Sequence, residues 1–192
     1  MNARADSKRQ TIINTALLLF SRQGYKGTTM RQIAKKTGMQ AGSLYNYIKS
    51  KENLLLEVQK AFVGDVIKEI GESQENLSAR EKLEKAFEAV MKGIAQNRLA
   101  WKVLVDEIQH FPLPLKKRVR MRGQMLEDLI KGILEEGKKT GEFEDFDTQM
   151  ATNFLLGACH HSSKWIDPKG RLSPKAIGEQ FAAFFIRGIY KR

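Results

Sequence analysis

Amide and hydroxyl side chains are concentrated in one short stretch of the chain, residues 40–47, which reads QAGSLYNY. Asn and Gln can bond the edge of an adenine, a Ser hydroxyl accepts several partners, and an alanine methyl can lie against a thymine methyl. The small residues at 41–43 would let a backbone come close to a groove wall. This composition favours reading of base edges in the DNA major groove, and the residues suited to it are Gln40, Ala41, Ser43 and Asn46.

Two short helices joined by a tight turn would position these side chains. Thr29 and Gln32 have the spacing of a capping box, which opens a helix, and Gly38 can adopt the left-handed conformation that ends it. A second helix over about 40–47 would bury Leu44 and Ile48. Tyr45, Tyr47 and Lys51 border that helix and could bond phosphate oxygens, which sets register. A plain packing role for the two helices, or for Tyr45, remains the alternative.

Positive charge is unevenly distributed along the chain. Residues 1–52 contain ten Lys and Arg against two acidic residues, whereas residues 53–192 contain 23 against 20, within a net charge of +11. A basic surface can simply be solvated, but a basic surface centred on a two-helix reading unit indicates binding to phosphates. An anionic membrane is disfavoured as the target, because the basic segment has no wide apolar face.

The same stretch resembles the TetR-like transcriptional repressors. The family pattern has a Gly, paired threonines, Ile-Ala, a Gly turn, Tyr-x-Tyr and Ser-Lys-Glu, which here are Gly24, Thr28, Thr29, Ile33, Ala34, Gly38, Tyr45, Tyr47, Ser50, Lys51 and Glu52. Gln40 departs from the usual capping Ser, and Ile48 replaces the common Phe.

The resemblance implies which residues touch DNA. It implies phosphate contacts from Thr28, Thr29, Tyr45, Tyr47 and Lys51. It implies base contacts from Arg31, Gln40, Ala41, Ser43 and Asn46, with a phosphate contact as the alternative for Arg31.

Helical periodicity extends over the rest of the chain, so we expect an all-α protein. An amphipathic helix over 8–22 would complete a three-helix DNA-binding domain, residues 1–52 with the reading unit at about 29–48. Residues 53–192 would form a helical ligand-binding and dimerisation domain. Its expected helices cover about 50–71, 78–96, 99–110, 115–139, 148–165 and 173–190.

The last two of these helices carry more apolar surface than inward packing requires, which suggests a homodimer with a four-helix interface. Such a pair would present two reading helices to the half-sites of a palindromic operator. The alternative is that the phenylalanines complete a monomer core. The expected interface residues are Phe154, Gly157, Ala158, Ile177, Phe181, Phe184 and Phe185.

The family resemblance also implies a small-molecule effector that moves the reading heads. Adaptable side chains that could line its site, each of which could equally be core, are Trp101, Leu104, Phe111, Met121, Met125, Leu129, Phe154 and Trp165. The C-terminal stretch is similar to TetR-type repressors that respond to acyl-CoA esters, where a Gly, a Trp and a Leu-Ser-Pro recur; here these are Gly157, Trp165 and 172–174.

An acyl-CoA also needs basic groups for its phosphates. The basic run at 116–122, from which Arg122 is taken as a ligand residue, and His161 with its neighbours His160 and Lys164 could supply them. A solvated helix face is the alternative for the run.

Other functions receive little support. The three histidines lack metal-ligand spacing, Cys159 and His160 are adjacent and so would not face one another on a helix, and no phosphate loop is present. We therefore expect no enzyme, no metal and no cofactor beyond the effector. A single cysteine and the lack of a signal peptide or long apolar run predict a cytoplasmic protein without a membrane partner. The competing function is non-specific, architectural DNA binding without an effector.

Overall fold

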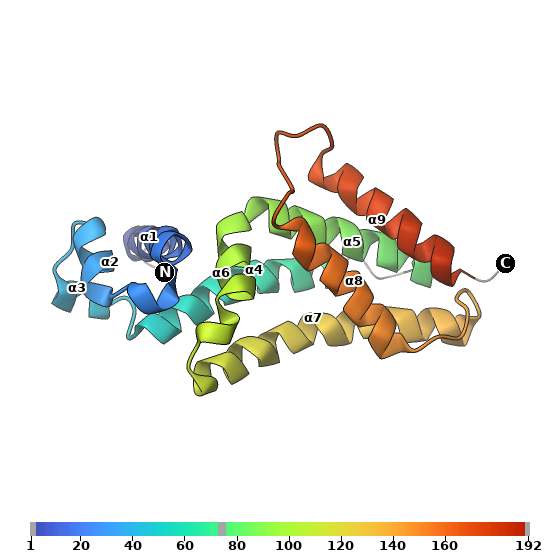
Figure 1. Cartoon of the computed structure of the whole chain (residues 1–192), viewed down its shortest axis with the longest axis horizontal. Helices are drawn as coiled ribbons and strands as arrows, with labels where there is room; N and C mark the ends of the chain where they lie inside the picture. The colour runs from blue at the N-terminus through green and yellow to red at the C-terminus, as the bar shows by residue number, and fades with distance from the viewer. Residues whose placement is uncertain (1–2, 73–75, 191–192) are drawn as a thin grey trace. The chain divides into compact units, whose positions relative to one another are not determined.

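The computed structural model describes residues 3–72 and 76–190, and these are helical over most of their length (Figure 1). No β-strand forms within these two ranges, where only an isolated bridge between Phe143 and Tyr190 has strand-like pairing. The all-α prediction is confirmed. The helices are α1 (Ala3–Gly27), α2 (Met30–Lys36), α3 (Ala41–Tyr45), α4 (Lys51–Glu72), α5 (Ala79–Gln96), α6 (Arg98–Asp106), the 3-10 helix η1 (Ile108–His110), α7 (Leu113–Thr140), α8 (Thr148–Ser162) and α9 (Pro174–Ile189).

Contacts within the chain define two compact units. The first comprises Met1–Phe62 and Leu99–Met121, and the second comprises Val63–Arg98 and Arg122–Arg192. Residue 52 was the expected boundary, but the first unit runs ten residues further and also takes in a distant segment. The difference arises because α4 starts at Lys51 as one continuous helix and α6 and η1 pack with the N-terminal helices.

The core of the first unit begins with the apolar stripe of α1. Ile12, Ala16 and Phe20 are at most 1% exposed, as the helical period of the sequence predicts. α1 extends beyond the expected 8–22, but Gly24 interrupts it with φ 77° and ψ 162°. Only glycine adopts this conformation without a steric penalty, so the chain turns here before α2.

In the second unit α5 and α9 run side by side (Figure 1). Phe87 and Phe185 meet across them with ring centroids 5.8 Å apart. Gly178 permits the close approach, since a Cβ there would lie 3.0 Å from the Cα of Glu88. α8 packs on α5 as well, where Ser162 Oγ lies 3.4 Å from the sulfur of Met91.

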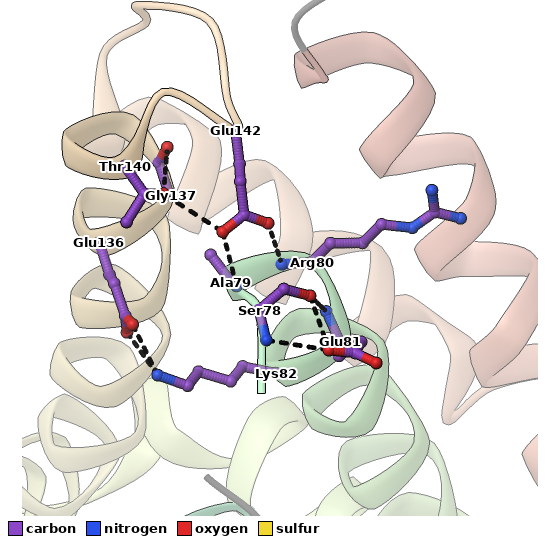
Figure 2. Close-up of polar contacts among 9 residues, drawn as sticks. All are labelled: Ser78, Ala79, Arg80, Glu81, Lys82, Glu136, Gly137, Thr140 and Glu142. Atoms are coloured by element: carbon purple, nitrogen blue, oxygen red, sulfur yellow. Dashed lines mark hydrogen bonds and ion pairs between the residues drawn. The ribbon is translucent and has the colours of Figure 1, made fainter. Parts of the chain in front are cut away.

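The start of α5 is held by side chains from α7 and from the turn after it (Figure 2). Ser78 caps α5 in a capping box with Glu81. The Glu142 carboxylate accepts from the N–H groups of Ala79 at 3.1 Å and Arg80 at 3.3 Å, which satisfies donors that a helix N-terminus leaves free. On the next turn Lys82 donates to Glu136 at 2.6 and 2.8 Å.

Several helix ends differ from the sequence-based expectation. α3 ends at Tyr45 rather than 47, α8 ends at Ser162 rather than 165, and the expected helix 99–110 divides into α6 and η1. α7 begins at Leu113, before the expected 115, because Pro114 is tolerated in a first helical turn, where no N–H donor is needed.

Candidate nucleic-acid interface

A helix-turn-helix forms where the sequence predicts one. Thr29 caps α2: its hydroxyl accepts from Gln32 N at 3.2 Å, while Gln32 Oε1 accepts from Thr29 N at 2.8 Å. Gly38 has φ 69°, the left-handed value expected for the turn. Leu44 and Ile48 are at most 2% exposed, so the opposite side of α3 faces outward.

The outward face of α3 brings together the predicted base-reading side chains. Gln40, Ser43 and Asn46 are exposed, and Ala41 is partly exposed beside them. The small side chains of Ala41 and Ser43, with Gly42 between them, leave this side of α3 open, as entry into a major groove requires. The expected base contacts of these four residues remain predictions.

Possible phosphate-binding groups lie around this face. Arg31 and Thr29 are exposed near the start of α2, Tyr45 is 48% exposed, and Tyr47 is partly exposed. The Thr29 hydroxyl is already used twice within the capping box: it accepts from Gln32 N at 3.2 Å and donates to Gln32 Oε1 at 3.1 Å, so a bond to phosphate would have to redirect its proton. Contacts of these four residues with DNA remain predictions.

Gln40 occupies the N-cap position of α3 but makes no side-chain cap bond. The departure from a capping Ser therefore leaves the first N–H groups of α3 without a side-chain acceptor. The Gln40 amide is thereby free of an intrahelical role.

Thr28 does not have the role expected from the resemblance. Its side chain is fully buried, and its hydroxyl donates to Gly24 O at 2.9 Å. Gln23 Nε2 donates to the same hydroxyl at 3.2 Å. The prediction that the Thr28 side chain binds phosphate is corrected: it fixes the turn that precedes α2.

Lys51 also points inward. Its Nζ donates to Tyr25 O at 2.8 Å and to Thr28 O at 2.9 Å, and it lies 4.2 Å from the centroid of the Tyr25 ring. Burial lowers the pKa of Lys51, while the nearby Glu52 carboxylate acts in the opposite direction. Two of its three N–H donors bond these carbonyls, so Lys51 ties the start of α4 to the turn before α2. Its contact with phosphate remains a prediction.

Tyr25 lies at the centre of these contacts and was missed by the sequence analysis. It is 2% exposed, and its hydroxyl donates to Glu52 at 3.2 Å. Burial, followed by the Glu52 charge and hydrogen bond, raises the pKa of Tyr25 far above its ordinary range. Burial alone would raise the pKa of Glu52, but hydrogen bonds from the backbone, Ser50 and Tyr25 and the charge of Lys51 lower it.

Glu107 was also missed. Its carboxylate accepts from Tyr25 N at 3.0 Å, a contact across 82 positions of sequence. No local pattern identifies such a residue, although a glycine before Tyr25 signals that a backbone N–H could be left without a helical partner.

The expected effector residues fall into three groups by exposure. Trp101, Leu104 and Phe111 are 5–6% exposed and belong to the packed interior of the first unit, where Trp101 meets the Phe62 ring at 4.6 Å. Leu129 and Arg122 are partly exposed. The exposed residues are Met121, Met125, Phe154, His161 and Trp165. A role for each in ligand binding remains a prediction.

His160 and Cys159, which are adjacent to His161 in the sequence or one residue further away, are poorly suited to bind an anion. Burial lowers the pKa of His160, so the neutral imidazole is favoured. Cys159 is fully buried, as expected of a small hydrophobe, and burial raises the pKa of its thiol. In the described ranges no three His, Cys, Asp or Glu side chains come together as metal ligands could.

The residues expected at a dimer interface are partly exposed and partly core. Phe184 and Phe154 are 70% and 69% exposed, and Gly157, Ala158 and Phe181 also reach the surface. Ile177 and Phe185 are only 5% and 8% exposed, and the Phe185 ring meets Phe87 of α5 with ring centroids 5.8 Å apart. These two therefore belong chiefly to the core of the second unit, and their predicted role at the interface is corrected.

Comparison with known proteins supports the family resemblance over most of the chain. Residues 12–58 match the family described as bacterial regulatory proteins, tetR family, and residues 76–189 match the tetracyclin repressor-like C-terminal domain. The chain belongs to the TetR family. Its members are DNA-binding regulators of transcription, which agrees with the helix-turn-helix. No described helix is both long and apolar enough to cross a bilayer.

Individual relatives cover almost the whole chain. The transcriptional repressor KstR2 of Mycolicibacterium smegmatis is 31% identical over 189 residues, which cover 95% of this chain and 91% of that protein. The fatty acid metabolism regulator protein of Bacillus subtilis is 25% identical over 190 residues, covering 96% and 97%. The structure of the ketosteroid regulator KstR2 of Mycobacterium tuberculosis superposes with a TM-score of 0.84 at 25% identity, covering 100% of this chain and 97% of that one.

A further structural neighbour contains a ligand. FadR of Bacillus subtilis in complex with stearoyl-CoA has a TM-score of 0.78 at 24% identity and covers 94% of this chain and 99% of its own. This similarity concerns the fold.

Proposed function

We propose that this TetR-family protein is a sequence-specific repressor, which binds a palindromic operator as a homodimer and is released by a small-molecule effector. The exposed polar face of α3, beside a buried Leu44, carries the proposal. The protein would act by binding alone, without catalysing a reaction, at the chromosome in the bacterial cytoplasm. Two copies would place their α3 helices in successive major grooves, about 34 Å apart.

The apolar surface of α8 and α9 supports the homodimer. Phe184 and Phe154, about two thirds exposed, are large hydrophobic side chains of the kind that dimer interfaces cover. Size-exclusion chromatography with light scattering tests this. We expect a dimer for the wild type, a monomer for Phe184→Glu, and a dimer for Met121→Glu, a control that is also 70% exposed but lies on α7. A monomeric wild type at micromolar concentration that still bound a palindrome tightly would contradict the proposal.

An acyl-CoA is the effector that the relatives support. One relative is named for fatty acid metabolism, and a neighbour of the same fold was solved with stearoyl-CoA. In this chain Lys117, Arg118 and Arg120 are exposed on α7 and could bind phosphates. Calorimetry with acyl-CoAs of increasing chain length should show binding. No heat and no release from DNA across the series would exclude this effector class.

Selection of bound fragments from a random DNA pool, with and without stearoyl-CoA, tests DNA specificity and release together. We expect enrichment of one palindromic sequence and its loss when the effector is added. Binding that hardly distinguishes sequences, combined with a steep salt dependence, would instead indicate architectural DNA binding.

A further inference from the structure

The segment 99–121 belongs to the C-terminal domain by sequence but packs with the N-terminal helices in the structure. Residues 99–121 lie inside the match to the C-terminal domain, 76–189, and outside the N-terminal match, 12–58. Yet Leu99–Met121 forms a single compact unit with Met1–Phe62. Part of the domain expected to bind the effector is therefore packed into the unit that carries α2 and α3.

The first attachment of this segment is made at the break in α1. Gly24, with φ 77°, interrupts the helix, so the N–H of Tyr25 cannot continue the helical pattern. Glu107 Oε2 accepts this N–H at 3.0 Å. A Cβ added at Gly24 would lie 3.2 Å from the same oxygen, which shows how closely the carboxylate fits against the break.

The second attachment is apolar. The Phe111 ring packs edge-on against Tyr25 at 4.9 Å and 64°, and Tyr25 in turn contacts Phe20 of α1 at 5.4 Å. Phe111 and Tyr25 are at most 5% exposed. Two independent contacts, one polar and one apolar, thus connect Glu107 and Phe111 to the same residue.

From Tyr25 a short series of bonds leads to α2. Lys51 bonds the carbonyls of both Tyr25 and Thr28, and the Thr28 hydroxyl bonds the carbonyl of Gly24. Thr29, the next residue, is the N-cap of α2. A shift of Tyr25 would therefore change where α2 begins, and α3 would follow because the two helices pack together across the Gly38 turn.

We propose that Glu107 is a positioning residue for DNA reading: through the Tyr25 N–H it fixes the 24–28 turn and so the orientation of α2 and α3. Displacement of the 99–121 segment would then be transmitted to the reading helices. The proposal rests on the function proposed above, because its consequence is measured as operator affinity.

The test compares full-length Glu107→Ala, Glu107→Gln and the neighbouring Asp106→Ala, whose native side chain is exposed. Amide exchange followed by NMR reports on the Tyr25 N–H directly. We expect Glu107→Ala to accelerate this exchange about tenfold or more, as for the loss of a bond to a charged acceptor. The amide oxygen of Glu107→Gln can still accept the bond and should restore most of the protection. Asp106→Ala should behave as the wild type.

Operator affinity is measured at 20 °C on the fragment that the wild type selects. Glu107→Ala should bind it about tenfold more weakly, whereas Glu107→Gln should stay within about threefold of the wild type. A purely structural role would lower the melting temperature but leave nearly all molecules folded at 20 °C, so the affinity would not change.

Two results would overturn the proposal: unchanged Tyr25 exchange in Glu107→Ala, or affinity of that variant within twofold of both the wild type and Asp106→Ala. If the proposed function is wrong, the result is different: the wild type itself enriches no sequence from the random DNA pool. The exchange measurement would still decide whether Glu107 holds the turn.

Discussion

Replacement of Lys51 by methionine tests whether this lysine holds the turn before α2 or binds DNA phosphate. Methionine keeps an unbranched stem of high helix propensity, so α4 should start as before. The change removes the ammonium group that bonds Tyr25 O and Thr28 O at 2.8 and 2.9 Å and lies over the Tyr25 ring. The turn before α2 then loses its link to α4.

The expected cost follows from these contacts. Hydrogen bonds to a charged group contribute about 1.5–3 kcal/mol each. Lys51 is only partly buried, and burial lowers its pKa, so desolvation of the ammonium group offsets part of the gain. We therefore expect Lys51→Met to lower the free energy of unfolding by about 2 kcal/mol. For a chain of this length the melting temperature should fall by about 4–8 °C.

Two measurements check this expectation. Thermal unfolding gives the change in melting temperature, with Lys49→Met as the control because Lys49 is exposed two residues away and its replacement should cost less than about 0.5 kcal/mol. The salt dependence of DNA binding gives the number of phosphate contacts, since each lost contact reduces the slope by about 1. We expect the slope of Lys51→Met to equal that of the wild type. An unchanged melting temperature together with a slope reduced by about 1 would refute the structural role.

Three further changes have defined outcomes. Gln40→Ser should stabilise the protein by about 0.5–1 kcal/mol relative to Gln40→Ala, measured by urea unfolding, because Ser can cap α3 where Gln40 makes no cap bond. The raised pKa of Tyr25 means that the folded state holds the phenolic proton more tightly than the unfolded state. The free energy of unfolding should therefore fall as the pH rises above about 10, and this loss should be smaller in Tyr25→Phe than in the wild type, as urea unfolding at pH 9 and 11 would show. Glu142→Ala should lower the free energy of unfolding by about 1–2 kcal/mol, because the carboxylate bonds two N–H groups at the start of α5, whereas exposed Glu144→Ala should change it little in the same assay.

Local signals account for the parts that could be predicted from the sequence. The Thr29–Gln32 capping box, the positive φ of Gly38 and the buried Leu44 each depend on residues within a few positions of one another, and the structure confirms all three. Helix ends were less well predicted, because the last turns depend on packing as much as on sequence.

The sequence by itself determined an all-α fold and a helix-turn-helix with a polar outer face, because capping, turn chemistry and helical periodicity act over a few residues. Only the tertiary structure decided that Lys51 and Thr28 bond inward and that Ile177 and Phe185 are buried. It also decided that Glu107 reaches Tyr25 across 82 residues. Whether a polar side chain meets solvent or a distant carbonyl depends on which segments pack together, and no local pattern records that choice.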